Sequence, residues 1–200
     1  FVCVPTPMNS NGSQDSSILE EVLQEIDKDL RESIVIVKST VLPNTVNKMK
    51  EKYNRFVYNP EFLREKTANE DFVNSDTLIL GGEGSHLEKV EQLYKKHSDC
   101  KIKNVHKTDV VSASLVKYSI NTFLATKVIF FNQLYDIYSS LVDNKNWDEF
   151  KNMISSDDRI GSSHMNVPGH DGKLGFGGAC FPKDTTALLA LSKIIDKEFT

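Results

Sequence analysis

Several features that would define other classes of protein are absent from this sequence. No apolar run reaches the length that crosses a bilayer, and no signal-peptide pattern opens the chain. Three cysteines (Cys3, Cys100 and Cys180) are odd in number and too widely spaced for a disulfide framework. The net charge is −4 with acids and bases interspersed, so no basic face indicates nucleic acid. These absences predict a cytoplasmic protein without membrane or nucleic-acid partners.

The chain also lacks the Gly-x-Gly-x-x-Gly turn that grips the pyrophosphate of a dinucleotide. Gly81-Gly-Glu-Gly84 is rich in glycine but does not have that spacing, and we do not expect it to bind phosphate. No Met precedes the apolar strand that we expect at Phe1–Val4. This start predicts that the chain is part, or a truncated version, of a longer parent.

The first half alternates buried-strand runs with amphipathic patterns. The strands are expected at 1–4, 34–37, 56–58 and, as the last one, 77–80; the helices are expected at 18–30, 41–53 and 85–96. The polar stretch 9–16 between the first strand and the first helix is expected to be a surface loop. This alternation is typical of α/β proteins, and it predicts half of a doubly wound, Rossmann-like parallel sheet over residues 1–105.

From Thr108 to about Val142 the sequence holds no glycine and no proline, and its apolar residues are not confined to one stripe. We expect one long helix here, the centre of an all-α domain over 106–200. A helix that is apolar on most sides is covered by its own domain and by a partner chain. The sequence therefore favours a homodimer, with a single-chain core as the alternative.

Lys117 and Lys127 are the only charged residues between Val110 and Leu134. Lysine is almost never buried without a partner, and Asn121 lies one helical turn after Lys117 on the same face. The pair indicates a binding site for a polar group. The alternative is a lysine that extends to water along its aliphatic stem.

Gly175-Phe-Gly-Gly-Ala-Cys-Phe-Pro-Lys-Asp184 precedes a helical pattern over 185–195. The glycines permit close approach of a ligand to the backbone, and Pro182 suits a first helical turn. A thiol at a helix N-terminus feels the positive end of the helix dipole, which favours thiolate, and Lys183 adds a charge. We interpret Cys180 as a nucleophile; the alternative is a buried structural cysteine. A metal site made of His164, His170, Asp171 and Cys180 has no compact spacing, and His170 as the base of a Cys–His hydrolase remains a rival.

Taken together, these motifs resemble the UDP-glucose/GDP-mannose dehydrogenase family, whose members use NAD to oxidise a nucleotide sugar twice, from alcohol to acid. The resemblance rests on VPTP at 4–7, KSTV at 38–41, NPEFLRE at 59–65, LVKYSIN at 115–121, RIG at 159–161 and GFGGACFPKD at 175–184, in family order. Lys66 departs from the pattern, because family members have glycine there. In family members a strand with a glycine-rich turn precedes this segment, and a further nucleotide-binding domain follows it.

The resemblance implies roles for individual residues. The catalytic residues would be Cys180, Lys117, Asn121, Glu61, Asp184 and Thr40. NAD would contact Thr6, Ser39, Thr40, Glu65 and Lys183. The nucleotide sugar would contact Glu61, Phe62, Leu63, Lys117, Asn121, Arg159, Phe176 and Gly177. No metal is expected, and UDP-glucose is the first candidate substrate, with UDP-glucuronate as product. The alternatives are GDP-mannose, a UDP-N-acetylhexosamine, or a truncated non-catalytic paralogue that binds nucleotide sugars or dimerises.

Overall fold

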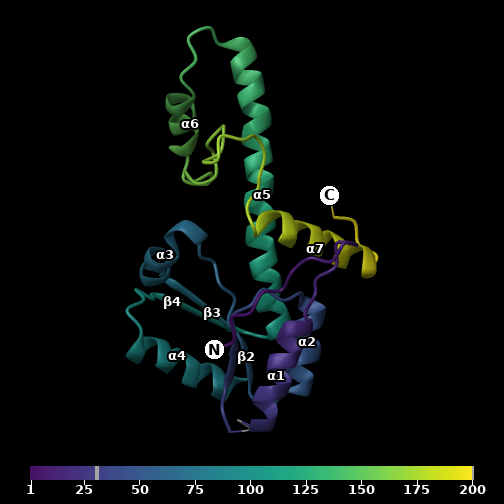
Figure 1. Ribbon diagram of the computed structural model, residues 1–200. Coiled ribbons are helices and arrows are strands. Elements are labelled where there is room, and N and C mark those ends of the chain that lie inside the picture. Colours follow the sequence, from purple (N-terminus) through teal and green to yellow (C-terminus); the bar gives the residue numbers. More distant parts are fainter. Residues whose placement is uncertain (30–31, 200) are drawn as a thin grey trace. The chain divides into compact units, whose positions relative to one another are not determined.

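The computed structural model of the chain describes residues 1–29 and 32–199, and every side chain among them except that of Glu65. The elements are α1 (Ser17–Asp29), β1 (Val35–Val37), α2 (Pro43–Lys52), β2 (Phe56–Tyr58), the 3-10 helix η1 (Glu65–Thr67), α3 (Ala68–Asn74), β3 (Thr77–Gly82), α4 (Gly84–His97), β4 (Asn104–Thr108), α5 (Val110–Leu141), α6 (Trp147–Ser155) and α7 (Phe181–Ile194) (Figure 1). They form two compact units, Phe1–Tyr118 with Ala187–Thr200, and Ser119–Thr186. Helices α5 and α7 each contribute to both units.

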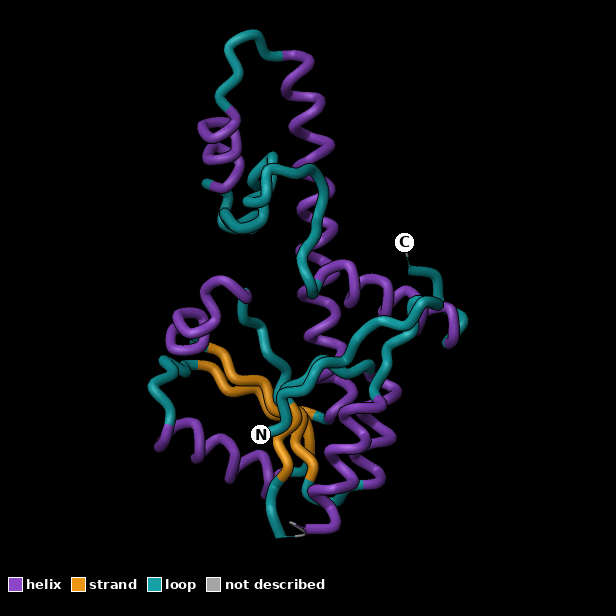
Figure 2. The backbone as a smooth tube through the Cα atoms, viewed as in Figure 1, coloured by secondary structure: helices purple, strands orange, loops and turns teal. Residues whose placement is uncertain are grey.

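The first unit contains a four-stranded sheet in the order β1-β2-β3-β4 (Figure 2). β1 and β2 run parallel, as do β3 and β4, which confirms the predicted α/β class, although the sheet is parallel only in part. The β2–β3 pair departs from the expected direction, because Val57 pairs with Gly82 and Tyr58 with Gly81 in an antiparallel ladder. Between these strands stand only η1 and the seven-residue α3, which buries no residue. The connection is long enough for a crossover, so its length does not explain the antiparallel direction of the pair.

Two further details of the sheet differ from the sequence-based prediction. The expected strand Phe1–Val4 contributes a single parallel bridge between Val2 and Val37. β3 is not the last strand, since β4 follows it with the sequence Asn-Val-His-Lys-Thr. Only Val105 in β4 is apolar, and a strand at the sheet edge with mostly exposed side chains leaves no hydrophobic run to recognise.

Side chains of the sheet alternate between two apolar layers, as the pleat of a strand requires. One face packs on α4 through Ile36, Val57, Leu78 and Leu80. The other packs on α1, α2 and the first turn of α5 through Val37, Phe56, Tyr58 and Ile79. Helices on both faces hold the strands rigidly and leave the carboxyl ends of β1 and β2 free to carry polar groups.

The second unit is built on the C-terminal part of α5. The predicted long helix is confirmed, because α5 runs without interruption through 32 residues. Phe131, Met165 and Val167 form the buried core of this unit, with Trp147 from α6 packed against them. Trp147 donates a hydrogen bond from Nε1 to the carbonyl of Met165 at 3.2 Å, which fixes the loop 156–180 to the helical frame. No helix in the described ranges has both the length and the apolar content needed to span a bilayer.

Gly81 marks the closest packing between the sheet and α5. A Cβ at Gly81 would lie 2.8 Å from the Cα of Val110 and 2.9 Å from the carbonyl oxygen of Asp109, both backbone atoms. We therefore expect Gly81→Ala to lower the free energy of unfolding by about 1–3 kcal/mol, the usual cost of overpacking. Urea unfolding checks this, with Gly84→Ala as the matched control, since nothing lies within 4 Å of a Cβ there. An equal loss in both variants would contradict the packing argument.

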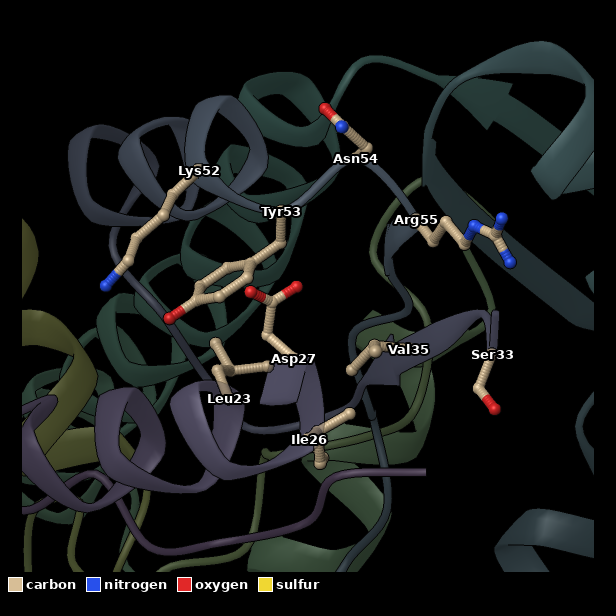
Figure 3. A pocket seen from close by; sticks show the side chains of 9 residues that line it. All are labelled: Leu23, Ile26, Asp27, Ser33, Val35, Lys52, Tyr53, Asn54 and Arg55. Carbon is tan, nitrogen blue, oxygen red and sulfur yellow. The ribbon is translucent and has the colours of Figure 1, made fainter. Parts of the chain in front are cut away.

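A pocket of about 510 Å³ opens at the amino ends of β1 and β2 (Figure 3). It is lined by Leu23, Ile26, Asp27, Ser33, Val35, Lys52, Tyr53, Asn54 and Arg55. Lys52 lies over the ring of Tyr53, with 5.2 Å between its ammonium and the ring centroid. Val35 begins β1 and Arg55 precedes β2, so the pocket lies at the opposite end of these strands from the polar motifs.

Candidate functional site

The polar motif that follows β1 is held by hydroxyl groups turned towards the backbone. Ser39 Oγ accepts from the amide of Val4 at 2.9 Å and donates to its carbonyl at 2.7 Å. Thr6 donates from Oγ1 to the carbonyl of Thr40 at 2.7 Å. Because Thr6 and Ser39 are both buried, these bonds fix the course of two neighbouring segments at the carboxyl edge of the sheet.

Gln14 completes this arrangement, although the sequence predicts only a surface loop around it. Its Nε2 donates to the carbonyl of Thr40 at 2.9 Å and to the hydroxyl of Tyr118 at 3.0 Å. Its Oε1 accepts from the amide of Leu42 at 3.0 Å. A polar residue in a polar stretch gives no signal of such long-range contacts, which only the fold creates.

Glu61 follows β2 with both carboxylate oxygens engaged. Oε2 forms an ion pair with Lys38 Nζ at 2.7 Å, and Oε1 accepts from the backbone amide of Phe62 at 3.0 Å. Lys38 also donates to Asn59 Oδ1 at 3.1 Å and to the hydroxyl of Tyr94 at 3.2 Å. Burial acts to lower the pKa of Lys38, but Glu61 and Tyr94 outweigh it and raise that pKa above its usual value. The lysine therefore stays charged through the neutral range.

Lys117 lies near the start of α5 and is only 7% exposed. Its ammonium stands over the ring of Phe62 at 5.1 Å from the centroid, the geometry of a cation–π contact. This is not a lysine that reaches open water along the helix surface. Phe62 and Lys117, both named by the family resemblance, therefore meet within the first unit.

Cys180 stands at the N-terminus of α7 in the second unit. Its carbonyl accepts the first helical hydrogen bond, from the amide of Asp184 at 2.9 Å, and its side chain is exposed. Asp184 is 1% exposed, and its two oxygens accept from Asn121 Nδ2 and Lys183 Nζ, each at 2.6 Å. A carboxylate so deeply buried is stable only with such donors. The site therefore presents an exposed thiol one turn before a fixed carboxylate.

The glycine-rich loop before Cys180 is anchored to α5. The amide of Gly175 donates to Asn132 Oδ1 at 2.9 Å, and Gly175 and Gly178 have φ angles of 79° and 78°, which favour glycine. The ring of Phe176 packs edge-on against Phe181 at 6.4 Å, and Gly177 is exposed. The loop is thus held at one end while its middle faces solvent.

Arg159 is exposed in the same unit and is bound by Asp157, with Nε 2.9 Å from Oδ1. The hydrogen bonds from Arg159 lower the pKa of Asp157. Leu63 is half-buried after Phe62, and the side chain of Glu65 lies outside the described residues.

His170 is exposed in a turn, and no hydrogen bond joins it to Cys180 within the described part of the chain. No group of three or more metal-ligating side chains occurs in that part either.

The structure thus brings the named residues together in two groups. Thr6 with Thr40 and Phe62 with Lys117 meet in the first unit, and Asn121, Lys183, Asp184 and Cys180 meet in the second. Sequence reasoning assigned no role to Gln14, Lys38, Asn59 and Tyr94. Lys38 and Asn59 begin the recognised motifs that follow β1 and β2, whereas nothing marks Tyr94 within its helix.

A sheet with polar motifs at the carboxyl ends of parallel strands is the arrangement of an α/β nucleotide-binding fold. The family model for the NAD-binding domain of the UDP-glucose/GDP-mannose dehydrogenase family matches residues 1–98. The model for the central domain of the same family matches residues 111–199. The chain belongs to this family, and the match to its NAD-binding domain confirms the predicted cofactor.

Individual relatives agree with the family models. The chain is 36% identical to UDP-glucose 6-dehydrogenase from Rickettsia bellii, over 100% of this chain and 45% of that protein. A UDP-glucose dehydrogenase structure from Pyrobaculum islandicum matches with 31% identity and a TM-score of 0.81, covering 99% of this chain and 46% of the other. A GDP-mannose dehydrogenase structure from Pseudomonas aeruginosa matches with 30% identity and a TM-score of 0.68, covering 99% and 47%. The chain thus spans about half the length of these relatives.

Proposed function

We propose that the protein to which this chain belongs oxidises the C6 alcohol of a nucleotide sugar to the acid with NAD, and that UDP-glucose is the substrate. The observation that carries the proposal is Cys180 at the N-terminus of α7, one turn before the buried Asp184 that Asn121 and Lys183 hold. Membership of the family and the names of the relatives support the reaction class. The NAD-binding half would span 1–105 and the helical half 106–200, in the reducing cytoplasm where cysteines stay unpaired.

NAD would lie at the carboxyl edge of the sheet, next to Thr6, Ser39 and Thr40, with Glu65 and Lys183 as further contacts. The residues present fit this position, because parallel strands β1 and β2 end there and Thr6 ties the two polar segments together. When bound, NAD supplies the hydride acceptor for both oxidations. The chain's own contribution is to place the sugar, take up protons and hold the carbon skeleton between the two steps.

In the first oxidation Glu61 would take the proton of the alcohol, directly or through a water held by Thr40 and Asp184, as a hydride leaves the C6 carbon. The oxygen that develops negative charge needs donors, and Lys117 and Asn121, one helical turn apart on α5, are suited to stabilise it. Phe62 and Leu63 with Arg159, Phe176 and Gly177 would bind the rest of the nucleotide sugar. The product of this step is an aldehyde.

The thiolate of Cys180 then adds to the aldehyde carbon to give a thiohemiacetal. Loss of a second hydride from that carbon, with loss of the hydroxyl proton, yields a thioester. Water activated by Glu61 attacks the thioester, and the thiolate leaves as the carboxylate forms. One alcohol, one water and two oxidised cofactors thereby give one carboxylate, two reduced cofactors and three protons.

The test is NADH formation by the protein with its native flanking segments, on UDP-glucose, GDP-mannose and a UDP-N-acetylhexosamine. We expect two NADH per UDP-glucose and much slower turnover of the others. A preference for GDP-mannose or the N-acetylhexosamine would change the proposed substrate but leave the proposed reaction standing. Tight binding of a nucleotide sugar without NADH formation on any of them would favour the non-catalytic paralogue.

We also propose that the protein forms a homodimer through α5. Phe123, Phe130 and Ile137 follow one another at seven-residue spacing on this helix and are 68%, 56% and 57% exposed. Residues at that spacing share one helix face, and an apolar face of this extent indicates an interface. A second copy of the chain is the partner we expect, since the same face on two copies is self-complementary about a two-fold axis.

This predicts a dimer in sedimentation velocity at micromolar concentration, and Phe130→Glu should shift it to a monomer with unchanged circular dichroism. Met153→Glu is the matched control, because Met153 is equally exposed at 62% but lies on α6. A wild-type monomer, or loss of the dimer in both variants, would assign the apolar face of α5 to a single-chain core instead.

A further inference from the structure

Lys38 is the residue in the first unit whose role the proposed reaction leaves unassigned. Its ammonium has three partners: Glu61 at 2.7 Å and Asn59 Oδ1 at 3.1 Å, both in the loop after β2, and the Tyr94 hydroxyl on α4 at 3.2 Å. The Lys38 side chain is 14% exposed, so it is largely removed from solvent. We propose that Lys38 is a positioning residue that fixes the Glu61 carboxylate in the orientation required of a general base.

The partners of Lys38 are themselves anchored, which a positioning role requires. Asn59 is 2% exposed and donates from Nδ2 to the carbonyl of Ile79 in β3 at 2.9 Å. The Tyr94 hydroxyl donates to Asn59 Oδ1 at 2.6 Å, and burial, its largest influence, raises the pKa of Tyr94 and keeps it a donor. Through Lys38, the carboxylate of Glu61 is therefore held by residues that are themselves fixed to the sheet and to α4.

Both carboxylate oxygens of Glu61 are held by hydrogen bonds, and each can still accept another one. Oε2 receives the Lys38 ammonium and Oε1 the Phe62 amide, and each oxygen of a carboxylate can accept two hydrogen bonds. One acceptor position on each oxygen therefore remains for a substrate hydroxyl or a water. Glu61 is 30% exposed, in keeping with access from solvent.

Stability alone explains this cluster poorly. An ion pair with one partner partly exposed contributes little to folding, and well-packed apolar residues serve as well in most buried positions. A cation beside a base has a geometric consequence instead, because the ion pair holds the carboxylate in one orientation. The titratable groups facing Lys38 are Glu61 and Tyr94, with Cys100 beyond Tyr94, so Glu61 supplies the only carboxylate in this described cluster.

The inference rests on the proposed function and is tested on the protein with its native flanks. We expect Lys38→Met to lower kcat by about 10- to 100-fold, as misplacement of a catalytic group does. The KM for the nucleotide sugar should change little, because Lys38 is not among the proposed substrate contacts. Lys38→Arg should recover part of the lost kcat, since it keeps a cation beside Glu61, although its planar fork differs from an ammonium. Tyr94→Phe should lower kcat by a smaller factor than Lys38→Met, because Glu61 and Asn59 still hold Lys38.

A double-mutant cycle separates positioning from general structural damage. If Lys38 acts through Glu61, adding Lys38→Met to Glu61→Gln should change kcat no further. Lys107→Met is the matched control, because Lys107 on β4 pairs with Glu91 at 2.6 Å in the same unit, and this variant should leave kcat unchanged. Should Lys38→Met fail to fold, Lys38→Arg and Tyr94→Phe carry the same test.

The outcomes distinguish this inference from the proposed function. An active wild type whose kcat is unchanged in the Lys38 and Tyr94 variants would overturn the positioning role alone. Additive losses from Lys38→Met and Glu61→Gln would also overturn it. A wild type that forms no NADH from any nucleotide sugar would overturn the proposed function and the inference together.

Discussion

Replacement of Cys180 by serine is expected to stop the reaction after the first oxidation rather than to slow every step equally. In the proposed reaction the first hydride transfer depends on Glu61 and Lys117 and makes no use of the thiol. Serine matches cysteine in shape, but its hydroxyl stays protonated at neutral pH, so addition to the aldehyde and formation of an acyl intermediate are both lost. The variant should therefore form at most a trace of aldehyde, with a yield of less than one NADH per sugar. Alternatively, it should keep an intermediate tightly bound.

Mass spectrometry checks the covalent part of this prediction. Wild type quenched during turnover should carry a nucleotide-sugar adduct on the peptide that contains Cys180, and Cys180→Ser should carry none. Cys3→Ser is the control, because Cys3 is also an exposed, unpaired cysteine and should leave the yield of NADH unchanged. Two NADH per sugar at the full rate from Cys180→Ser would remove the thiol from the mechanism.

The parts of this fold that the sequence predicted are those with an unbroken local pattern. The β-branched run before Lys38 predicts β1, and the absence of glycine and proline from 108 to 142 predicts α5, which ends within one residue of the expected position. Helix α7 begins at Phe181, with Pro182 in its first turn, earlier than the pattern over 185–195 indicates. In each case the signal comes from neighbours in sequence, and local propensity suffices to read it.

The parts that the sequence did not predict depend on contacts between distant segments. β3 runs antiparallel to β2, and the hydrophobic periodicity of a strand carries no information on its direction. β4 has one apolar side chain and pairs along its whole length with β3, so its strand conformation comes from the neighbouring strand. Tertiary context decided both outcomes.

The candidate site divides in the same way. Motif spacing indicated Asn121 and Asp184 separately, and the structure joins them by a hydrogen bond across 63 positions of the chain. Lys38 and Asn59 stand inside recognised motifs, but only the fold shows that Tyr94 of α4 completes their cluster. Partners contributed by a distant helix face cannot be read from a single sequence, because nothing in Tyr94's own neighbourhood differs from an ordinary core position.

Loss of the Lys117 ammonium is expected to lower turnover by about 10²- to 10³-fold, the effect of removing one donor from a developing oxyanion. Lys117 is 7% exposed and lies over Phe62, so its position is set before substrate arrives. Two variants separate charge from packing. Lys117→Met keeps the buried stem and Lys117→Ala removes it, and both should lose turnover to a similar degree while differing in melting temperature.

Lys127, the other lysine of this apolar stretch, is the control. Its ammonium donates to the carbonyls of Ile160 and Gly161 at 2.9 and 3.0 Å, a structural role within the second unit. Lys127→Met should therefore lower the melting temperature and leave turnover per folded molecule nearly unchanged. Single-turnover measurement of the first hydride transfer, set beside thermal unfolding of each variant, decides between the two roles. If both Lys117 variants lost melting temperature and kept turnover per folded molecule, Lys117 would be a packing residue like Lys127, and the oxyanion would need another donor.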